Sequence, residues 1–245
     1  GIDSAVVLSL AVEALGSDNV RVLLLPSEFS SSHSITDAEA LARNLSIEHS
    51  IISIKGVYDA SLDALAPLFK SLPFSTAEEN LQARIRGVLL MAVSNKFGDI
   101  VLNTSNKSEV AVGYGTLYGD TTGSLSVLGD VYKTDVFKLA RYINRESEVI
   151  PIHIITKAPS AELHHGQKDS DSIPEYDVLD KILFQYIEGG KSQEELLTMG
   201  FLKEKVVKVV ELIKKNEYKR HQACPALRVS SKAFSEIKIP LLAVY

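Results

Sequence analysis

The sequence predicts an α/β fold in which helices cover both faces of a parallel β-sheet. Three short apolar runs, at residues 20–25, 51–54 and 100–102, have the length and composition of buried strands. Segments with helical periodicity separate these runs along the chain. Strands that alternate with helices pair in parallel, because each helix crosses over the sheet before the next strand begins. The 245 residues fit one large domain, since single cores stop growing at roughly 250–300 residues.

The composition excludes some classes of protein. The chain is 45% hydrophobic and 23% charged, which is ordinary for a soluble globular domain. Its net charge of -5 disfavours a general nucleic-acid binder, which would carry a basic face, but permits a small anionic ligand. The single cysteine, Cys224, excludes an internal disulfide and favours a reducing, cytoplasmic compartment. The apolar run Ala5–Leu15 contains Glu13, so we expect neither a signal peptide nor a membrane span.

A helix is predicted at residues 5–15, where Gly16 provides a stop signal. Gly1, Asp3 and Ser4 precede it. A glycine, an acid and a serine at a helix start can hold a phosphate through backbone N–H groups and the positive end of the helix dipole. The alternative is an ordinary cap made by Asp3 or Ser4. The GxxxxGK[ST] loop of other nucleotide-binding proteins is absent from the chain.

Further helices are predicted from their start signals. The pairs that could form capping boxes are Thr36 with Glu39, Ser75 with Glu78, Thr76 with Glu79, and Ser192 with Glu195. They predict helices ending near residue 45, at about 77–96, and shortly after residue 192. The apolar spacing also predicts helices at residues 133–143 and 202–213.

The polar stretch after the third strand, residues 103–120, is the main candidate site. It places a hydroxyl, an ammonium and a carboxylate within six residues: Thr104, Lys107 and Glu109. Ligands of open parallel sheets bind beyond the carboxyl ends of the strands. The stretch therefore suits a phosphorylated ligand with a hard cation. The alternative is a solvated polar connection.

Three other features favour or disfavour ligand roles. Lys133 opens a predicted helix, where a cation is unfavourable toward the helix dipole, and this conflict favours a ligand role over a surface charge. Residues 164–177 are predicted to form a loop, and the acids near His164 and His165 raise the alternative of a metal site. No repeated ligand spacing supports that alternative. The basic cluster at 217–222 indicates a solvated face unless an anionic ligand lies close.

These motifs resemble a known enzyme family. Residues 1–4 resemble the end of the Ser-Gly-Gly-x-Asp-Ser pyrophosphate loop of N-type ATP pyrophosphatases. Within that superfamily, the rest of the chain closely resembles NAD synthetase, in order and over nearly its whole length. The segments that carry this resemblance are 80–86 (NLQARIR), 103–109 (NTSNKSE), 113–120 (GYGTLYGD), 159–163 (PSAEL), 167–169 (QKD), Pro174 with Tyr176, and 218–220 (YKR).

The resemblance implies a fold and a reaction. The family has a flavodoxin-like, doubly wound parallel sheet with helices on both faces, of the adenine nucleotide alpha-hydrolase-like type. It is a carbon–nitrogen ligase that uses ATP and Mg²⁺ to amidate deamido-NAD. The nicotinate carboxylate attacks the α-phosphate of ATP to give an adenylate and pyrophosphate, and ammonia then displaces AMP. A homodimer is implied in the same way.

The resemblance also assigns residues. Asp3 and Glu109 would hold Mg²⁺, and together with Lys133 they form the expected catalytic set. The residues assigned to ATP and its phosphates are Gly1, Ser4, Thr104, Lys133 and Ser160. The residues assigned to deamido-NAD are Arg84, Asp120 and Lys219, with Thr104 nearby.

One departure from the family pattern indicates a subtype. Ammonia-dependent members commonly have a lysine where this chain has Leu117, and the form GYGTLYGD resembles glutamine-dependent members. Those members carry an amidotransferase domain, for which this chain has no room. We therefore expect residues 1–245 to be one synthetase domain, truncated within its pyrophosphate loop and part of a longer protein that supplies ammonia from glutamine. The alternatives are another ATP pyrophosphatase, such as GMP synthetase, and a nucleotide-binding module without catalysis.

Overall fold

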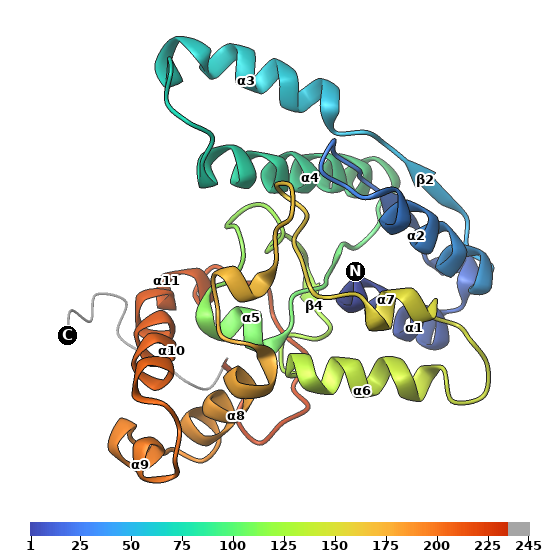
Figure 1. Cartoon of the computed structure of the whole chain (residues 1–245). Coiled ribbons are helices and arrows are strands. Elements are labelled where there is room, and N and C mark those ends of the chain that lie inside the picture. The colour runs from blue at the N-terminus through green and yellow to red at the C-terminus, as the bar shows by residue number, and fades with distance from the viewer. Residues whose placement is uncertain (235–245) are drawn as a thin grey trace.

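Figure 1 shows the computed structural model, which describes residues 1–234. The helices are α1 (Ile2–Leu15), α2 (Ser32–Asn44), α3 (Lys55–Phe69), α4 (Thr76–Phe97), α5 (Lys107–Val112), α6 (Lys133–Ile143), α7 (Ile152–Thr156), α8 (Tyr176–Ile187), α9 (Gln193–Thr198), α10 (Lys203–Lys215) and α11 (Glu217–Arg220). Helices α3 and α4 lie at one end of the molecule and α8 to α10 at the other. Helix α5 lies between them (Figure 1).

The strands pair in parallel, as the sequence predicts. Strand β1 (Val22–Leu24) pairs with β2 (His49–Ile51), and β3 (Leu102–Asn103) pairs with β4 (Leu125–Ser126). The strands are shorter than the apolar runs, and the prediction of a strand at 51–54 is shifted. Ile54 is fully buried but serves as the N-cap residue of α3, so the apolar run there reports burial rather than an extended chain.

The helix-start signals were partly correct. Ser75 caps α4, where its backbone N–H donates to Glu78 Oε2 at 2.8 Å, and Ser192 caps α9 in the same way. The prediction for Thr36 was wrong, because that residue lies inside α2. The cap of α2 is Ser31, whose Oγ accepts from the Ser34 N–H at 3.2 Å. Helices α3, α5, α7, α8 and α11 are additional to the prediction.

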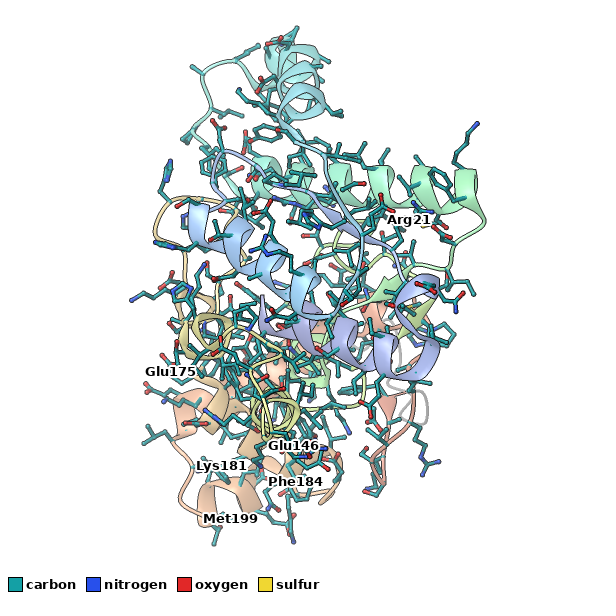
Figure 2. The ribbon with its side chains drawn as sticks, turned by 90° about the vertical axis from the view of Figure 1, so that its right-hand side faces the viewer. Arg21, Glu146, Glu175, Lys181, Phe184 and Met199 are labelled. Atoms are coloured by element: carbon teal, nitrogen blue, oxygen red, sulfur yellow. The ribbon has the colours of Figure 1, made fainter. Side chains whose placement is uncertain are left out.

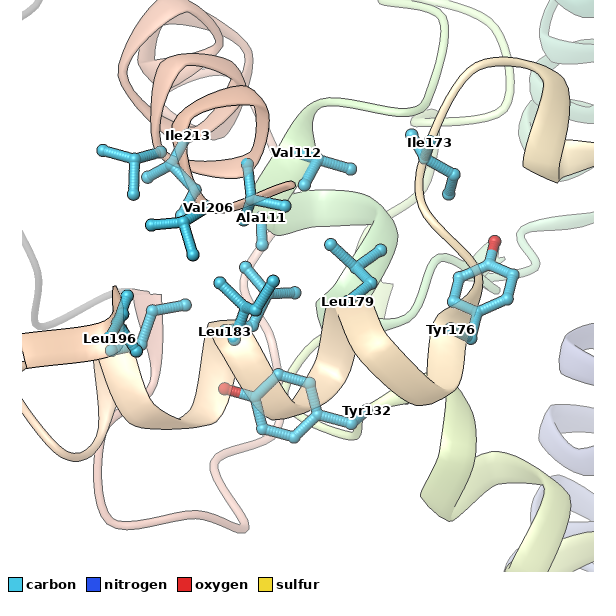
Figure 3. Close-up of a cluster of buried hydrophobic side chains, with 14 residues drawn as sticks. Ala111, Val112, Tyr132, Ile173, Tyr176, Leu179, Leu183, Leu196, Val206 and Ile213 are labelled. Carbon is cyan, nitrogen blue, oxygen red and sulfur yellow. The ribbon is translucent and has the colours of Figure 1, made fainter. Parts of the chain in front are cut away.

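Two hydrophobic clusters support the centre of the molecule. One packs α1 against α6 and α7, and includes Val6, Val136 and Ile154. The other joins α5, α8, α9 and α10, and Figure 3 shows Leu179 and Leu183 of α8 among its members. Burial of each apolar side chain in such clusters is worth about 1.5–3 kcal/mol. The clusters therefore fix the positions of α1, α5 and α6, whose first residues carry the candidate site.

Polar contacts hold the outer parts of the chain. The guanidinium of Arg21, which is labelled in Figure 2, donates to Asp99 at 2.9 Å and lies 4.3 Å from the centre of the Phe97 ring. These contacts join the start of β1 to the end of α4. Within residues 1–234, no helix is both long and apolar enough to cross a lipid bilayer.

Candidate active site

Three helices begin at one place in the structure. Asp3 lies in the first turn of α1, Glu109 in the first turn of α5, and Lys133 is the first residue of α6. Each helix start carries partial positive charge, from backbone N–H groups that lack partners within the helix. The sequence places these residues far apart, and the fold brings them together.

Lys133 joins the two acids. Its Nζ lies 2.5 Å from Asp3 Oδ2 and 3.3 Å from Glu109 Oε1. The other Asp3 oxygen accepts from Asn106 Nδ2 at 2.9 Å. The side chain of Lys133 is only 3% exposed, so the surface-charge alternative for this residue is wrong. Asp3 engages Asn106 and Lys133, and the side chain that contacts the N-cap residue, Gly1, is that of Ser4. The ordinary-cap alternative for Asp3 is therefore wrong as well.

The charges of this cluster do not balance. Burial and the neighbouring Asp3 raise the pKa of Glu109 to about 8, against the opposing effect of Lys133. Burial alone would lower the pKa of Lys133, but Glu109 and Asp3 raise it above its usual value, so its ammonium stays charged. Two acids thus face one permanent cation. The cluster favours uptake of either a proton on Glu109 or a further cation.

The donor set fits Mg²⁺. The ion prefers hard oxygen ligands, and proteins commonly hold it with one or two carboxylates while substrate phosphates and waters complete the shell. Asp3 and Glu109 supply such a pair. In the part of the chain that the structure describes, no group of three or more His, Cys, Asp or Glu side chains forms a metal cage. The site therefore suits a metal shared with a polyphosphate rather than one held by protein alone.

A second group of polar side chains supports Glu109. The Tyr176 hydroxyl lies 3.5 Å from Glu109 Oε1 and donates to Asp169 Oδ2 at 2.8 Å. The Tyr114 hydroxyl donates to Asp169 Oδ1 at 3.0 Å. Asp169 is buried in a short 3-10 helix, Asp169–Asp171, so the segment predicted as a loop is anchored at this point. Sequence reasoning assigned no role to Asp169 or Tyr176, although both lie in motifs of the resemblance.

Asn106 was also missed. Its Oδ1 accepts from the Glu109 N–H at 3.0 Å, which caps α5, while its Nδ2 holds Asp3. The signal was available, because an asparagine three residues before a glutamate is a capping pattern. One side chain thus fixes the starts of α1 and α5 against each other.

The remaining residues assigned to ATP lie at the start of α1, after β3 and after α7. Ser4 Oγ donates to the Gly1 carbonyl at 2.9 Å. Thr104 follows β3 and is partly buried. Ser160 lies in the loop after α7, where its Oγ accepts from the Glu162 N–H at 3.2 Å.

The residues assigned to deamido-NAD each form a hydrogen bond with the backbone of the loop at 113–120. Arg84 Nε donates to the Leu117 carbonyl at 3.2 Å, and Asp120 Oδ1 accepts from the Thr116 N–H at 2.5 Å. Lys219 Nζ donates to the carbonyls of Gly113 and Gly115, at 2.7 Å each. The solvated-face reading is therefore wrong for Lys219, whose pKa is lowered by burial.

The same loop packs directly on α4 through two glycines. A Cβ atom on Gly119 would lie 2.9 Å from the Ala83 Cβ, and one on Gly87 would lie 2.9 Å from the Tyr118 carbonyl oxygen. These distances are shorter than carbon contacts allow. The loop can approach Arg84 only because both positions lack a side chain.

Comparison with known proteins identifies the family of this chain. The family model described as NAD synthase matches residues 1–223. The chain belongs to the NAD synthase family. It is 53% identical over 234 residues to a glutamine-dependent NAD(+) synthetase of Synechocystis, covering 96% of this chain and 42% of that protein. It is 50% identical over 245 residues to one of Acinetobacter baylyi, covering 99% of this chain and 45% of that protein. The chain thus spans less than half the length of these curated relatives.

Solved structures of this family share the fold. A glutamine-dependent NAD+ synthetase of Acinetobacter baumannii in complex with ADP matches with TM-score 0.64 and 45% identity, over 98% of this chain and 44% of that one. An NMN synthetase of Francisella tularensis matches with TM-score 0.75 and 32% identity, over 90% and 83%. An NH3-dependent NAD synthetase of Campylobacter jejuni matches with TM-score 0.68 and 30% identity, over 89% and 82%. These matches confirm the predicted fold class.

Proposed function

We propose that this chain carries out the ATP-dependent amidation of deamido-NAD to NAD, as a carbon–nitrogen ligase. The observation that carries the proposal is the cluster of Asp3, Lys133 and Glu109 where three helices begin, in a member of the NAD synthase family. Helix starts and a buried lysine suit the phosphates of ATP, and the two carboxylates suit a shared cation.

The residues of the cluster have distinct roles in this proposal. The N–H groups at the start of α1 and the Lys133 ammonium bind the phosphates, while Asp3 and Glu109 would hold Mg²⁺. When bound, Mg²⁺ neutralises charge on the phosphate oxygens. On ATP binding, Lys133 exchanges part of its contact with Asp3 for a phosphate oxygen. The ammonium then stabilises the charge that develops as pyrophosphate leaves.

The reaction balances in two steps. A nicotinate carboxylate oxygen attacks the α-phosphorus, the α–β bridging bond breaks, and pyrophosphate leaves. Ammonia then attacks the carbonyl carbon of the adenylate, the carbon–oxygen bond to AMP breaks, and the nitrogen loses a proton. The protein's contribution is to position the reactants and to stabilise charge, because the nucleophiles are already reactive.

The loop at 113–120 is the proposed site of deamido-NAD. Arg84 donates from Nε to the Leu117 carbonyl, and its terminal nitrogens would bind an anionic group of the substrate. Asp120 is exposed at the end of the same loop and would accept from a ribose hydroxyl. Lys219 is already committed to two loop carbonyls, so its role is to hold the loop in shape.

Ammonia is the proposed nucleophile. The chain aligns with 82% of the NH3-dependent relative of Campylobacter jejuni but with only 42% of the glutamine-dependent relative of Synechocystis. The shared part is therefore the part that amidates. We infer that an amidotransferase domain of the same protein supplies ammonia from glutamine, in a cytoplasmic enzyme whose single cysteine suits a reducing compartment.

A homo-oligomer belongs to the same proposal. Helices α3 and α4 and the segment between them expose large apolar side chains, which favour a protein contact. They are Val57, Leu68, Leu72, Phe74, Val88, Met91 and Phe97. Sedimentation of the natural protein that carries this sequence tests the assembly, and a monomer at micromolar concentration would contradict it.

Release of AMP tests the function. The natural protein that carries this sequence is incubated with ATP, Mg²⁺ and ammonium, and with deamido-NAD, nicotinate mononucleotide, xanthylate or citrulline. We expect deamido-NAD to give the fastest release. A preference for nicotinate mononucleotide would favour the activity named for the Francisella relative, and a preference for xanthylate or citrulline another ATP pyrophosphatase. ATP binding without release of AMP under any condition would favour a non-catalytic module.

A further inference from the structure

Helix α6 starts without a cap of its own. Its N-cap residue, Tyr132, makes no side-chain hydrogen bond to the helix. The first N–H groups of a helix need acceptors from elsewhere, particularly when they are buried. Two of them find acceptors on other helices: the Lys133 N–H donates to Ser108 Oγ at 2.9 Å, and the Thr134 N–H donates to Asp180 Oδ2 at 2.8 Å.

The two acceptors are themselves joined. Ser108 Oγ donates to Asp180 Oδ1 at 2.5 Å. The direction is fixed, because the Lys133 N–H can only donate and the serine hydroxyl is then left to donate to the carboxylate. Ser108 is fully buried and Asp180 is 5% exposed. Asp180 of α8 thus binds the first turn of α5 and the first turn of α6 at once.

The bonded residues adjoin the candidate catalytic residues. Ser108 directly precedes Glu109, and Thr134 directly follows Lys133. The 3.3 Å separation of Lys133 Nζ and Glu109 Oε1 therefore depends on how α5 and α6 are held together. We propose that Asp180 and Ser108 are positioning residues that fix Glu109 and Lys133 for adenylate formation. This inference rests on the proposed function, and neither residue contacts the reacting atoms.

Stabilisation of α6 alone does not explain why its first N–H groups bind side chains of two other helices. A serine or aspartate at position 132 could cap α6 locally, and an exposed cap of that kind is worth about 1 kcal/mol. The chain instead buries a carboxylate, and burial raises the pKa of Asp180 despite its hydrogen bonds. A buried carboxylate is costly unless it is fully hydrogen-bonded. Unlike a local cap, the Asp180 carboxylate fixes the start of α6 relative to the start of α5.

A matched pair of variants tests the hydroxyl. Ser108→Thr keeps the hydroxyl. Ser108→Val has the shape of threonine but lacks the hydroxyl, so the two variants fill the packed site equally. Misplacement by about 1 Å can cost 10²-fold in rate. We expect kcat to be roughly 10–100-fold lower in the valine variant than in the threonine variant, with smaller changes in KM for ATP and deamido-NAD. Equal kcat values would overturn the positioning role.

A second experiment separates positioning from loss of stability. Asp180→Asn is made in the wild type and in a Lys133→Met background. If Asp180 acts through Lys133, Asp180→Asn lowers turnover roughly 10–100-fold in the wild type but less than about 3-fold in the Lys133→Met background. The reason is that the effects of two substitutions that act on the same interaction do not add. Its effect on the melting temperature is the same in both. Equal fold losses in both backgrounds would show a general structural role and reject the proposal.

Hydrogen exchange tests the positioning proposal separately from the proposed function. The amides of Lys133 and Thr134 should exchange slowly in the wild type and in Ser108→Thr, and faster in Ser108→Val. If the wild type does not amidate deamido-NAD but the exchange rates follow this order, the proposed function fails and the hydrogen-bonded arrangement stands. If the wild type is active and the valine variant matches the threonine variant in both exchange and kcat, the positioning proposal fails and the function stands.

Discussion

Lys107 is a fully buried cation whose removal should destabilise the fold. Its Nζ lies 2.6 Å from Glu188 Oε1 and 2.8 Å from Asp130 Oδ1. It also donates to Ser230 Oγ at 2.9 Å and to the Lys232 carbonyl at 2.8 Å. The side chain thus links the first residue of α5 to the end of α8 and to the segment at 230–232, so the prediction that Lys107 supplies an ammonium for a phosphorylated ligand was wrong.

Lys107→Met keeps the length of the side chain and removes the charge. Two buried carboxylates then face each other without a cation, a change that typically costs about 3–5 kcal/mol. Whole domains have a free energy of unfolding of only about 5–15 kcal/mol. A domain of this size loses roughly 2–4 °C in melting temperature per kcal/mol, so we expect a fall of about 6–20 °C.

The matched control is Lys138→Met. Lys138 also lies 2.8 Å from an aspartate, Asp135, but its side chain is 73% exposed. Exposed pairs of this kind contribute little, so no measurable shift is expected. Thermal unfolding followed by circular dichroism measures both. Adding Asp130→Asn and Glu188→Gln to Lys107→Met should recover part of the loss. Equal small shifts for Lys107→Met and Lys138→Met would refute the reasoning.

Three further predictions concern the site. Glu109→Gln should abolish AMP release. The pKa of Glu109 in the folded state, about 8, lies above its value in the unfolded state, so the free energy of unfolding of the wild type falls as pH rises toward 8. Without metal, the melting temperature of Glu109→Gln should therefore rise relative to that of the wild type between pH 5 and pH 8.5. A constant difference would contradict this. Lys133→Met should lose about 3–4 kcal/mol of transition-state stabilisation, a several-hundred-fold fall in turnover, and undiminished turnover would count against its role. Gly119→Ala should raise KM for deamido-NAD more than for ATP, since its Cβ would meet Ala83, whereas Gly56→Ala, with open space around it, is the control. Equal KM values in the two glycine variants would reject the loop assignment.

Local signals predicted the elements that local chemistry determines. The helix at 133–143 and the Ser75 cap were found because periodicity and capping act within a few residues. The prediction for Thr36 failed because its sequence matches a capping box while Ser31, five residues earlier, is the N-cap. Helix α5 was missed because its six residues are too few to show periodicity.

The site was predictable where the residue types are unusual for their position. Lys133 stands at a predicted helix start, where a cation is unfavourable toward the helix dipole. An acid at a helix start is ordinary, so the roles of Asp3 and Glu109 were predicted from the resemblance of residues 1–4 and 103–109 to family motifs. Asp180 was not predictable, because its partner Ser108 lies 72 residues away and neither shows a local pattern. Tyr176 likewise reaches Glu109 across 67 residues. Such contacts follow from the packing of α8 on α5, which only the fold reveals.

The most direct test of the central assignment follows the oxygen atoms. Deamido-NAD labelled with ¹⁸O in its nicotinate carboxylate is incubated with ATP, Mg²⁺, ammonium and the natural protein that carries this sequence, and the products are analysed by mass spectrometry. Attack of the carboxylate on the α-phosphorus predicts one labelled oxygen in AMP and none in pyrophosphate. Label in inorganic phosphate with formation of ADP, or unlabelled AMP, would contradict the account.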